Sequence, residues 1–240
     1  VAQSPGYPDK ERYSGVPAHD EIAILFDTDG DGRMDAKKVF HTGLDLVTSL
    51  VLHRDGILVS DSPDILFLRD TNGDDVCDQV ETVFTGFGFG DTHAVMSNLR
   101  WGLDGWIYAT QGYSGGDSRH VKNASGKDFG HIGNGIFRFQ PDGSAIEMVS
   151  AYGSNTWGLD FSSDGELFFS MANGDHLRHV VMPEGALAEA RYGDAQSWAY
   201  IADHDRVVPL LTHTDAPYAQ IDFVGGFTAC SGCCLYTGGA

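Results

Sequence analysis

Basic residues are scarce in this chain of 240 residues. Its 15 lysines and arginines stand against 34 aspartates and glutamates, which gives a formal charge of −19. Nucleic acids and anionic membrane surfaces both bind positively charged protein surface, so the deficit argues against either partner. The sequence also has no stretch that approaches the roughly 20 apolar residues of a membrane-spanning helix, so we expect no direct membrane insertion.

Targeting and haem motifs are missing as well. Residues 1–4, Val-Ala-Gln-Ser, have no signal-peptide character, so we expect a mature protein or a fragment rather than a full precursor. Of only four cysteines, Cys77 is isolated, and three lie in the segment ACSGCCLY: Cys230, Cys233 and Cys234. Cys233 is followed by cysteine, not by the histidine of a CxxCH haem attachment, so haem c is expected only if a domain exists beyond Ala240. These cysteines could form a structural disulfide or stay as buried thiols, contribute half of a metal site, or act as a redox pair. We favour the first interpretation.

Acidic residues, by contrast, form two matching loops. FDTDGDGRMD (residues 26–35) and RDTNGDDVCD (residues 69–78) place oxygen-bearing side chains at relative positions 1, 3, 5 and 9. Such spacing, with a main-chain carbonyl at position 7, suits Ca²⁺. The first loop has no Glu at position 12, so it is not a helix-flanked EF-hand loop and resembles the shorter calcium loops between strands. The predicted ligands of two structural calcium ions are Asp27, Asp29, Asp31, Arg33 and Asp35, and Asp70, Asn72, Asp74, Val76 and Asp78. Solvated acidic turns are the alternative.

The calcium hypothesis also bears on location. Extracellular calcium modules bind at roughly 0.1 to 1 mM, above cytosolic calcium levels, so we expect a periplasmic or extracellular protein. The composition, 42% hydrophobic and 11% aromatic, is that of a folded globular protein.

Short strand patterns repeat between the acidic loops. Each loop follows an apolar run, and Asp-Gly hairpins recur in LVLHRDGILVSD, LRWGLDGWIYAT and LDFSSDGELFFS. A unit of about 40 to 50 residues is typical of a β-propeller blade. We therefore predict an N-terminal extension over residues 1–20 and an all-β propeller over residues 21–240. About four blades are visible, as in a fragment of a six-bladed ring. A β-sandwich is the rival fold.

The segment DTHAVMSNLRWGLDGWIYATQGYSGGD, residues 91–117, resembles the soluble glucose/sorbosone dehydrogenase-like propellers. The closest resemblance is to planctomycete-type proteins known as membrane-bound dehydrogenase-like or haem-binding-domain propellers, and it extends over residues 20–240. In quinone-dependent members a histidine precedes the RWG hairpin, and His93 stands there. An Arg-Asn pair of the family corresponds to Ser154 and Asn155, so the chain departs from the arginine that helps hold pyrroloquinoline quinone (PQQ). The resemblance further implies that Asn173 and Gly174 contact a cofactor-bound calcium.

The resemblance implies oxidation of a sugar-like hydroxyl, with electrons passing through the quinone to a cytochrome. His93 would be the catalytic base, and Asp91 would orient it or cap a loop. Gln111 and Asp117 flank a long insertion and are expected near the cofactor or substrate. Further candidates at this end of the propeller are His176, beside Asp175, and His213. Each of these polar residues has a purely structural alternative, and Trp101, Trp106 and Trp157 are expected to fill gaps between blades.

Two classes of function follow. The first is a calcium-stabilised oxidoreductase, a PQQ-type sugar dehydrogenase. The second is a catalytically inactive calcium-binding propeller that acts as a binding or assembly subunit, which the serine at position 154 favours. A propeller lactonase is a weaker third choice, because convergent Glu/Asn/Asp metal ligands are not evident in the sequence.

Overall fold

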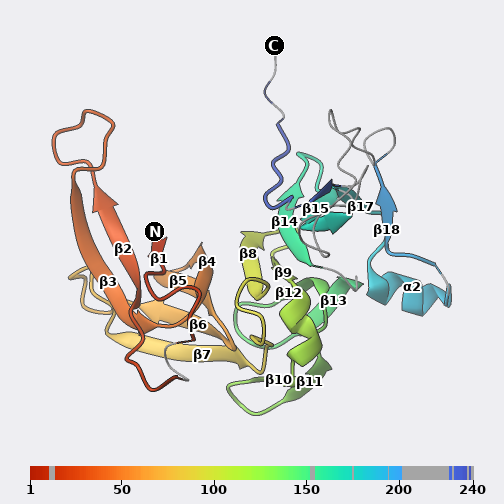
Figure 1. Ribbon diagram of the computed structural model, residues 1–240, viewed down its shortest axis with the longest axis horizontal. Coiled ribbons are helices and arrows are strands. Elements are labelled where there is room, and N and C mark those ends of the chain that lie inside the picture. Colours follow the sequence, from red (N-terminus) through yellow and green to blue (C-terminus); the bar gives the residue numbers. More distant parts are fainter. Residues whose placement is uncertain are drawn as a thin grey trace, which may run out of the picture.

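The computed structural model describes residues 1–10, 14–151, 155–174, 176–193, 195–201, 227–228, 230–236 and 238 (Figure 1). Strand makes up 46% of the structure and helix 6%, so the protein is all-β, as predicted. Four sheets of three or more strands follow one another along an arc in chain order, and none of them closes on itself (Figure 1).

The four sheets are antiparallel and are built mostly from strands that are consecutive in the chain. The first contains β1 (Ala2–Gln3), β2 (Asp20–Phe26) and β3 (Ala36–Leu44). The second contains β4 (Val47–His53), β5 (Gly56–Asp61), β6 (Asp64–Arg69) and β7 (Gln79–Thr85). The third contains β8 (Met96–Trp101), β9 (Ile107–Gln111), β12 (Gly135–Phe139) and β13 (Ile146–Ala151). The fourth contains β14 (Thr156–Phe161), β15 (Leu167–Met171), β17 (Arg178–Val180) and β18 (Trp198–Tyr200).

The remaining elements lie between or beside these strands. They are the short helices η1 (Tyr113–Asp117) and α2 (Glu184–Ala190), the hairpin of β10 (His120–Asn123) and β11 (Asp128–His131), and the pair β16 (Asn173–Gly174) and β19 (Phe227–Thr228). The β10–β11 hairpin comes from the insertion in the third sheet, but β10 pairs with β7 and so extends the second sheet to six strands.

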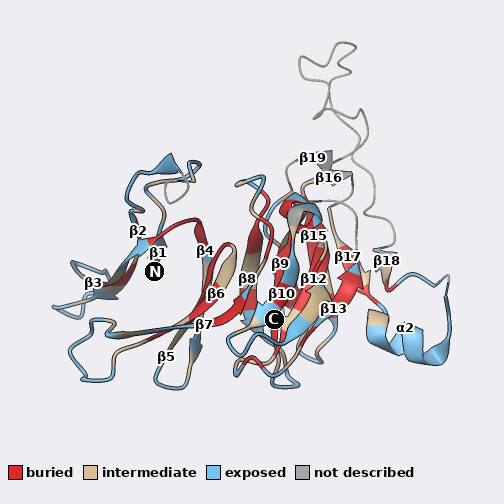
Figure 2. Ribbon diagram, turned by 90° about the horizontal axis from the view of Figure 1, so that it is seen from below, coloured by how far each residue is buried: buried red, intermediate tan, exposed pale blue. Residues whose placement is uncertain are grey.

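Each apolar cluster lies between two successive sheets. Ile65 of β6 and Phe137 of β12 belong to one cluster, so the second and third sheets share a core. A second cluster joins Ile136 of β12 to Phe169 of β15, and a third joins Ile22 of β2 to Val59 of β5. The buried residues accordingly run through the middle of the sheets, while the loops are exposed (Figure 2). Pairwise packing of this kind along an arc differs from the two face-packed sheets of a β-sandwich.

The first strands of three sheets, β4, β8 and β14, lie side by side. Polar contacts join them at several levels. The indole Nε1 of Trp101 donates to the carbonyl of Leu52 at 2.9 Å, and the Thr48 hydroxyl donates to the carbonyl of Met96 at 2.5 Å. The amide of Asn98 donates to the carbonyl of Trp157. These bonds hold the first strands together without direct ladder pairing between sheets.

The antiparallel order assigns every connection to one of two ends of the strands. The acidic-loop end carries residues 27–35 between β2 and β3 and residues 70–78 between β6 and β7. The histidine end carries the β7–β8 connection with His93, the end of β9 with Gln111, and the start of β14 with Asn155. The strand β7 separates the second acidic loop from His93, so the two candidate sites lie at opposite ends of one strand.

Two predicted hairpin glycines adopt the expected conformation, and one does not. Gly105 and Gly165 have φ angles of 78° and 89° in their turns. In the first hairpin the positive φ, 50°, falls on Arg54 instead. Gly56 is required there for a different reason, because a Cβ would overlap the carbonyl of Leu68 on the paired strand.

Within the described segments, Cys77, Cys233 and Cys234 are free thiols and take part in no disulfide. Cys233 lies in residues 230–236, which run beside β14. A Cβ on Gly158 of that strand would come within 2.7 Å of the Cys233 nitrogen. The amide of Leu235 donates to Asp160 at 2.7 Å. Cys233 is thus a partly buried thiol, whose pKa is raised to about 11 by burial and by the nearby Asp160 carboxylate.

Candidate functional sites

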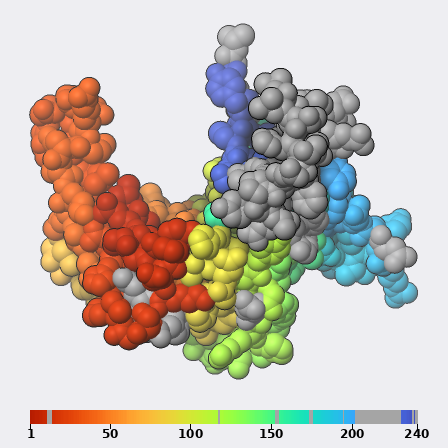
Figure 3. All heavy atoms as spheres, in the orientation of Figure 1, coloured from red at the N-terminus to blue at the C-terminus, as the bar shows by residue number. Residues whose placement is uncertain are grey.

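The first acidic loop folds around the Asp27 carboxylate. One oxygen accepts the main-chain N–H of Gly30 at 2.7 Å, and the other accepts that of Gly32 at 2.9 Å. Asp29 and Asp31 accept N–H groups two residues ahead. Oxygens of Asp27, Asp29 and Asp31 all lie within 4.8 Å of one another. The structure thus brings together three of the predicted ligands on the projecting β2–β3 hairpin (Figure 3).

The second loop repeats this pattern position by position. Asp70 accepts N–H groups of Gly73 and Asp75, each at 2.7 Å, as Asp27 does in the first loop. Asn72 accepts the N–H of Asp74 at 2.9 Å, and Asp74 that of Val76 at 3.0 Å. Two separate stretches of sequence therefore fold into the same loop, although the second has the amide of Asn72 where the first has a carboxylate.

Position 9 has a role in the loop that the sequence did not reveal. Asp35 accepts the N–H of Thr28 at 3.0 Å and its hydroxyl at 2.6 Å, which closes the loop at its base. Asp78 accepts the same two groups of Thr71 at 3.0 and 2.7 Å. Asp35 is not among the three carboxylates that converge. The threonine at position 2 in both copies was the available signal.

Main-chain N–H donors also lower the pKa values of the first aspartate in each loop, Asp27 and Asp70. Donation from Gly32, ahead of that from Gly30 and Asp31, holds the pKa of Asp27 below its usual value. For Asp70, burial raises the pKa, but the combined donation from Gly73, Asp75 and neighbouring amides outweighs burial and lowers it. Both carboxylates are consequently ionised at neutral pH and are suited to a hard cation.

The second loop also contacts the neighbouring sheet. The N–H of Cys77 donates to the carbonyl of Phe40 in β3 at 2.8 Å. The ammonium of Lys38, also in β3, lies 3.6 Å from the carboxylate of Asp75 and donates to the carbonyl of Asp74. The loop therefore fixes the outer strand of one sheet against the next, in addition to joining β6 and β7.

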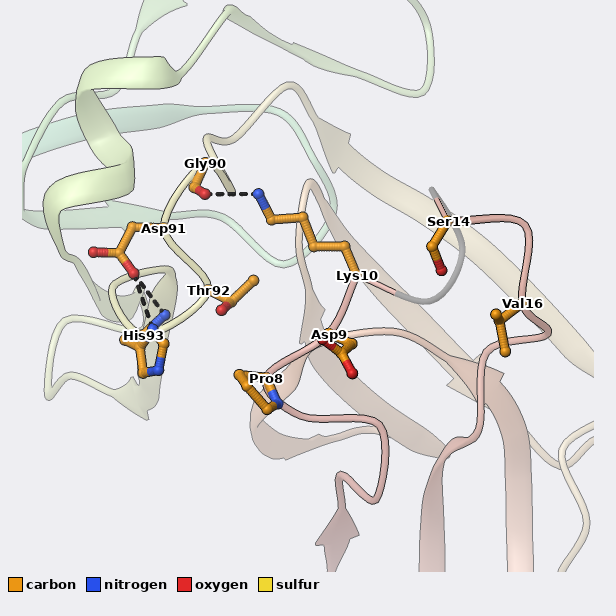
Figure 4. A pocket seen from close by; sticks show the side chains of 9 residues that line it. All are labelled: Pro8, Asp9, Lys10, Ser14, Val16, Gly90, Asp91, Thr92 and His93. Carbon is orange, nitrogen blue, oxygen red and sulfur yellow. Dashed lines mark hydrogen bonds and ion pairs between the residues drawn. The ribbon is translucent and has the colours of Figure 1, made fainter.

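At the histidine end, His93 is oriented by Asp91. One carboxylate oxygen of Asp91 accepts the main-chain N–H of His93 at 3.0 Å and lies 3.2 Å from its Nδ1 (Figure 4). The His93 side chain is 63% exposed, and Nε2 has no partner among the described residues. Because Nδ1–H donates to the carboxylate in this tautomer, Nε2 carries the free lone pair that a proton acceptor needs.

The loop that holds His93 rests on the insertion of the third sheet. The buried Ser114 of η1 donates its hydroxyl to the carbonyl of Asp91 at 2.7 Å and accepts the Asp91 N–H at 2.9 Å. The N–H of Ser114 donates to the carbonyl of Ala94 at 3.0 Å. These bonds fix the main chain on both sides of His93, and sequence reasoning gave Ser114 no role.

Two clefts meet at His93. The smaller, about 310 Å³, lies among the first strands and is lined by Thr48 of β4, Ser97 of β8 and Trp157 of β14, with Tyr7 beside the histidine. The larger, about 940 Å³, is an open hollow between the His93 loop and Pro8, Asp9, Lys10, Ser14 and Val16 of the N-terminal segment (Figure 4). Trp157, expected only as a filler between blades, is thus a wall of the smaller cleft.

Gln111 and Asn155 lie deeper at the same end. The Gln111 side chain is fully buried, and neither its Oε1 nor its Nε2 has a hydrogen-bond partner within the described part of the chain. The Asn155 Oδ1 is also buried without a partner among these residues, and a Cβ on Gly112 would come within 2.6 Å of it. Gly112, the residue that follows Gln111, lies against the Asn155 side chain, so the structure places these two candidates near each other. Neither of them lines the two clefts at His93.

Other candidates are placed in part. The main chain of Asn173 and Gly174 pairs with that of Thr228 and Phe227 at the histidine end. The positions of Ser154, Asp175 and His213 and the side chain of Asp117 lie outside the described residues. The guanidinium carbon of Arg138 lies over the Trp106 ring, 4.6 Å from the ring centroid. Trp106 also packs against the core between the third and fourth sheets.

These observations define an all-β protein with paired acidic loops at one end of its strands and a histidine-lined cleft at the other. The sequence matches, over residues 1–240, the family model described as Domain of unknown function (DUF7133), and the chain belongs to that family. Comparison with curated proteins returned no match. Among the described residues, no helix has the length and apolar character needed to cross a bilayer.

Proposed function

We propose that the chain is part of a calcium-stabilised β-propeller that oxidises a sugar-like hydroxyl outside the cytosol. The orientation of His93 carries the proposal. Asp91 holds one ring nitrogen, and the other is free at the junction of two clefts. A base in this position can take the proton of a substrate hydroxyl, and the Asp91 carboxylate stabilises the resulting imidazolium.

The propeller part of the proposal is supported by the order of the sheets. Consecutive four-stranded meanders pack through shared cores, and their first strands lie together, as do the inner strands of blades around an axis. A ring of six blades would contain the four sheets seen here. The small cleft among β4, β8 and β14 would then lie at its centre, where propellers bind ligands.

Calcium fits both acidic loops. The first offers three convergent carboxylates, and the second has the same main-chain bonding with Asn72 as a neutral oxygen donor. Main-chain carbonyls of Arg33 and Val76 would complete the ligand sets. Calcium there would offset the repulsion among neighbouring carboxylates and fix the β2–β3 and β6–β7 connections.

A quinone cofactor would take its hydrogen bonds from the polar groups behind His93. Gln111 and Asn155 have buried polar atoms without partners, and such atoms need a ligand or ordered water. Asn173 and Gly174 are the residues that would face a cofactor-bound calcium. PQQ bound there would supply the hydride acceptor for the substrate carbon, and a cytochrome would be the acceptor of the electrons. His93 receives the hydroxyl proton at Nε2, and Tyr7 and Trp157 bound the space beside it.

The test is reconstitution. Purified protein is titrated with PQQ in the presence of Ca²⁺ and followed by the quinone spectrum, and dye reduction is then measured with a panel of aldoses. The proposal expects saturable quinone binding and aldose-dependent dye reduction. Calcium binding without either activity would contradict it.

A noncatalytic binding or assembly propeller is the second candidate, and one observation favours it. Gln111 and Asn155 are covered and do not line the clefts that contain His93. In that case their unpartnered atoms hold ordered water. For such a protein, substitution of cleft residues would abolish binding of its partner, and PQQ would have no effect on that binding.

A further inference from the structure

A third cleft at the histidine end is lined by basic and apolar groups. It has a volume of about 550 Å³, and its walls include Pro63, Phe87, Phe89, Arg119, His120 and Lys122. Among the described residues, none of the nine that line it is acidic. In a protein of net charge −19, a cleft whose described lining holds two permanent cations and no carboxylate is locally favourable for an anion.

The cations of this cleft are available to a ligand. The side chains of Arg119 and Lys122 take part in no hydrogen bond or ion pair shorter than 4 Å within the described part of the chain, and both residues are exposed. His120 is different, because its Nδ1 lies 2.9 Å from the carboxylate of Asp128. Asp128 thereby holds one ring nitrogen of His120, and the guanidinium of Arg119 and the ammonium of Lys122 are the permanent cations of the cleft.

The floor of the cleft is rigid. The N–H groups of Gly86 and Phe87 both donate to the carbonyl of Pro63 at 3.1 Å, and the N–H of Arg119 donates to that of Gly86 at 2.9 Å. Gly86 has a φ of 109°, and a Cβ there would come within 2.6 Å of the His120 carbonyl. Three segments are therefore fixed to one another by main-chain bonds, so the site needs little ordering when a ligand binds.

The cleft adjoins the His93 site. Gly90 lines both this cleft and the hollow beside His93, three residues away in the same loop. The ammonium of Lys10 donates to the Gly90 carbonyl at 2.6 Å (Figure 4). It also lies 5.5 Å from the ring centroid of Phe89. A third cation thus stands at the boundary between the two spaces.

We propose that this cleft is a subsite for the anionic group of a charged sugar, a uronate or a sulfated hexose, whose neighbouring hydroxyl part extends to His93. The inference rests on the proposed function. Arg119 and Lys122 would bind the carboxylate or sulfate through charge-assisted hydrogen bonds. Phe89 and Pro63 would cover the apolar face of the ring. The volume lies within the range typical of small-molecule sites.

The test compares the binding of four probes by calorimetry: glucose, glucuronate, glucose 6-sulfate and acetate. We expect both charged sugars to bind about tenfold or more tightly than glucose or acetate, which corresponds to at least one charge-assisted hydrogen bond. The preference should weaken with added salt. Arg119→Gln should remove most of it. Arg54→Gln, an equal charge change at the acidic-loop end in a cleft that also contains Asp55, Glu81 and Asp142, should leave it intact.

Equal binding of glucose and glucuronate, equal binding of acetate and glucuronate, or equal effects of the two arginine variants would each overturn the inference. Dye reduction separates it from the proposed function. Oxidation of neutral aldoses without any preference for charged sugars refutes the subsite alone. Tight binding of charged sugars without dye reduction refutes the oxidoreductase and keeps the subsite as that of a binding protein. Melting temperatures of all variants check that they are folded.

Discussion

The rings of Tyr7 and His93 meet edge to face, with 5.4 Å between their centroids and 75° between their planes. Tyr7 belongs to the stretch 1–20 that the sequence predicts to be an extension. In the structure, described residues of this stretch contact the site, because Ser4 donates its hydroxyl to the carbonyl of Val47 at 2.8 Å and Lys10 donates to the carbonyl of Gly90. The N-terminal segment is therefore a wall of the histidine site.

Replacement of Tyr7 tests this wall. Tyr7→Ala removes the ring that borders His93 in the small cleft, and we expect KM for the substrate to rise about tenfold with a smaller change in kcat. Tyr7→Phe keeps the ring and should resemble the wild type. Steady-state kinetics of the reconstituted protein measure both constants. A loss in kcat alone, equal in the two variants, would assign Tyr7 a different role.

The acidic loops predict a dependence of thermal stability on calcium. A site filled at ten times its Kd stabilises the folded state by about 1.4 kcal/mol. Asp27→Asn and Asp70→Asn each replace an acceptor of several main-chain N–H groups in one loop. Each variant should therefore lose roughly half of the calcium-dependent rise in Tm, and the double variant should lose all of it.

The control for the loops is Glu189→Gln on the exposed surface of α2, which should keep the full calcium response. Scanning calorimetry with calcium and with a chelator measures the difference. A double variant that still responds to calcium would place the ion elsewhere.

Cys233 should react slowly with thiol reagents. Its pKa is raised to about 11 by burial first and by the Asp160 carboxylate second, so the reactive thiolate is scarce at pH 8. Cys234 is exposed and serves as the internal reference. Mass spectrometry of alkylated peptides should show Cys234 modified well before Cys233 in the folded protein, and equal rates in urea. Equal rates in the folded protein would contradict the buried position.

The same pKa implies a stability change at high pH. Because the folded pKa of Cys233 lies above its ordinary value of 9.0, this thiol favours folding fully below pH 9. The contribution falls as pH rises from 9 to 11, since the unfolded chain ionises first. Denaturant unfolding of the wild type and of Cys233→Ala between pH 8 and 11 should show a steeper loss for the wild type. Parallel curves would rule the thiol out as the cause.

The core between the second and third sheets predicts a large loss of stability. Phe137 is fully buried in the cluster that both sheets share, and its ring centroid lies 5.2 Å from that of Phe87. Phe137→Ala should cost about 3–5 kcal/mol in the free energy of unfolding. Val80→Ala, at a position 47% exposed, should change it by about 0.5 kcal/mol or less. Urea titration measures both, and a small effect at Phe137 would mean that the sheets do not stabilise each other.

Much of the fold followed from local patterns. Alternating apolar residues and Asp-Gly turns identified the hairpins around Gly105 and Gly165, since their conformation depends on residues close in the sequence. The identical spacing of the acidic loops likewise predicted two matching structures. The role of Gly56 was missed because it depends on the Leu68 carbonyl of a paired strand, which no local pattern reports.

The site was harder to predict because it is assembled from distant segments. His93 and Asp91 are close in sequence, and their pairing was one of the two stated alternatives. Tyr7, Thr48 and Trp157 reach the same cleft only because β4, β8 and β14 lie together and the N-terminal segment covers the loop. Ser114 carries no motif, and its importance comes from its burial beneath Asp91.

The most direct test of the central claim is the effect of His93→Gln on the reconstituted protein. Glutamine keeps a polar side chain of similar reach but cannot accept the hydroxyl proton. We predict that quinone binding persists while dye reduction falls by roughly 10²- to 10⁴-fold. Unchanged dye reduction in His93→Gln, with quinone bound, would contradict the account.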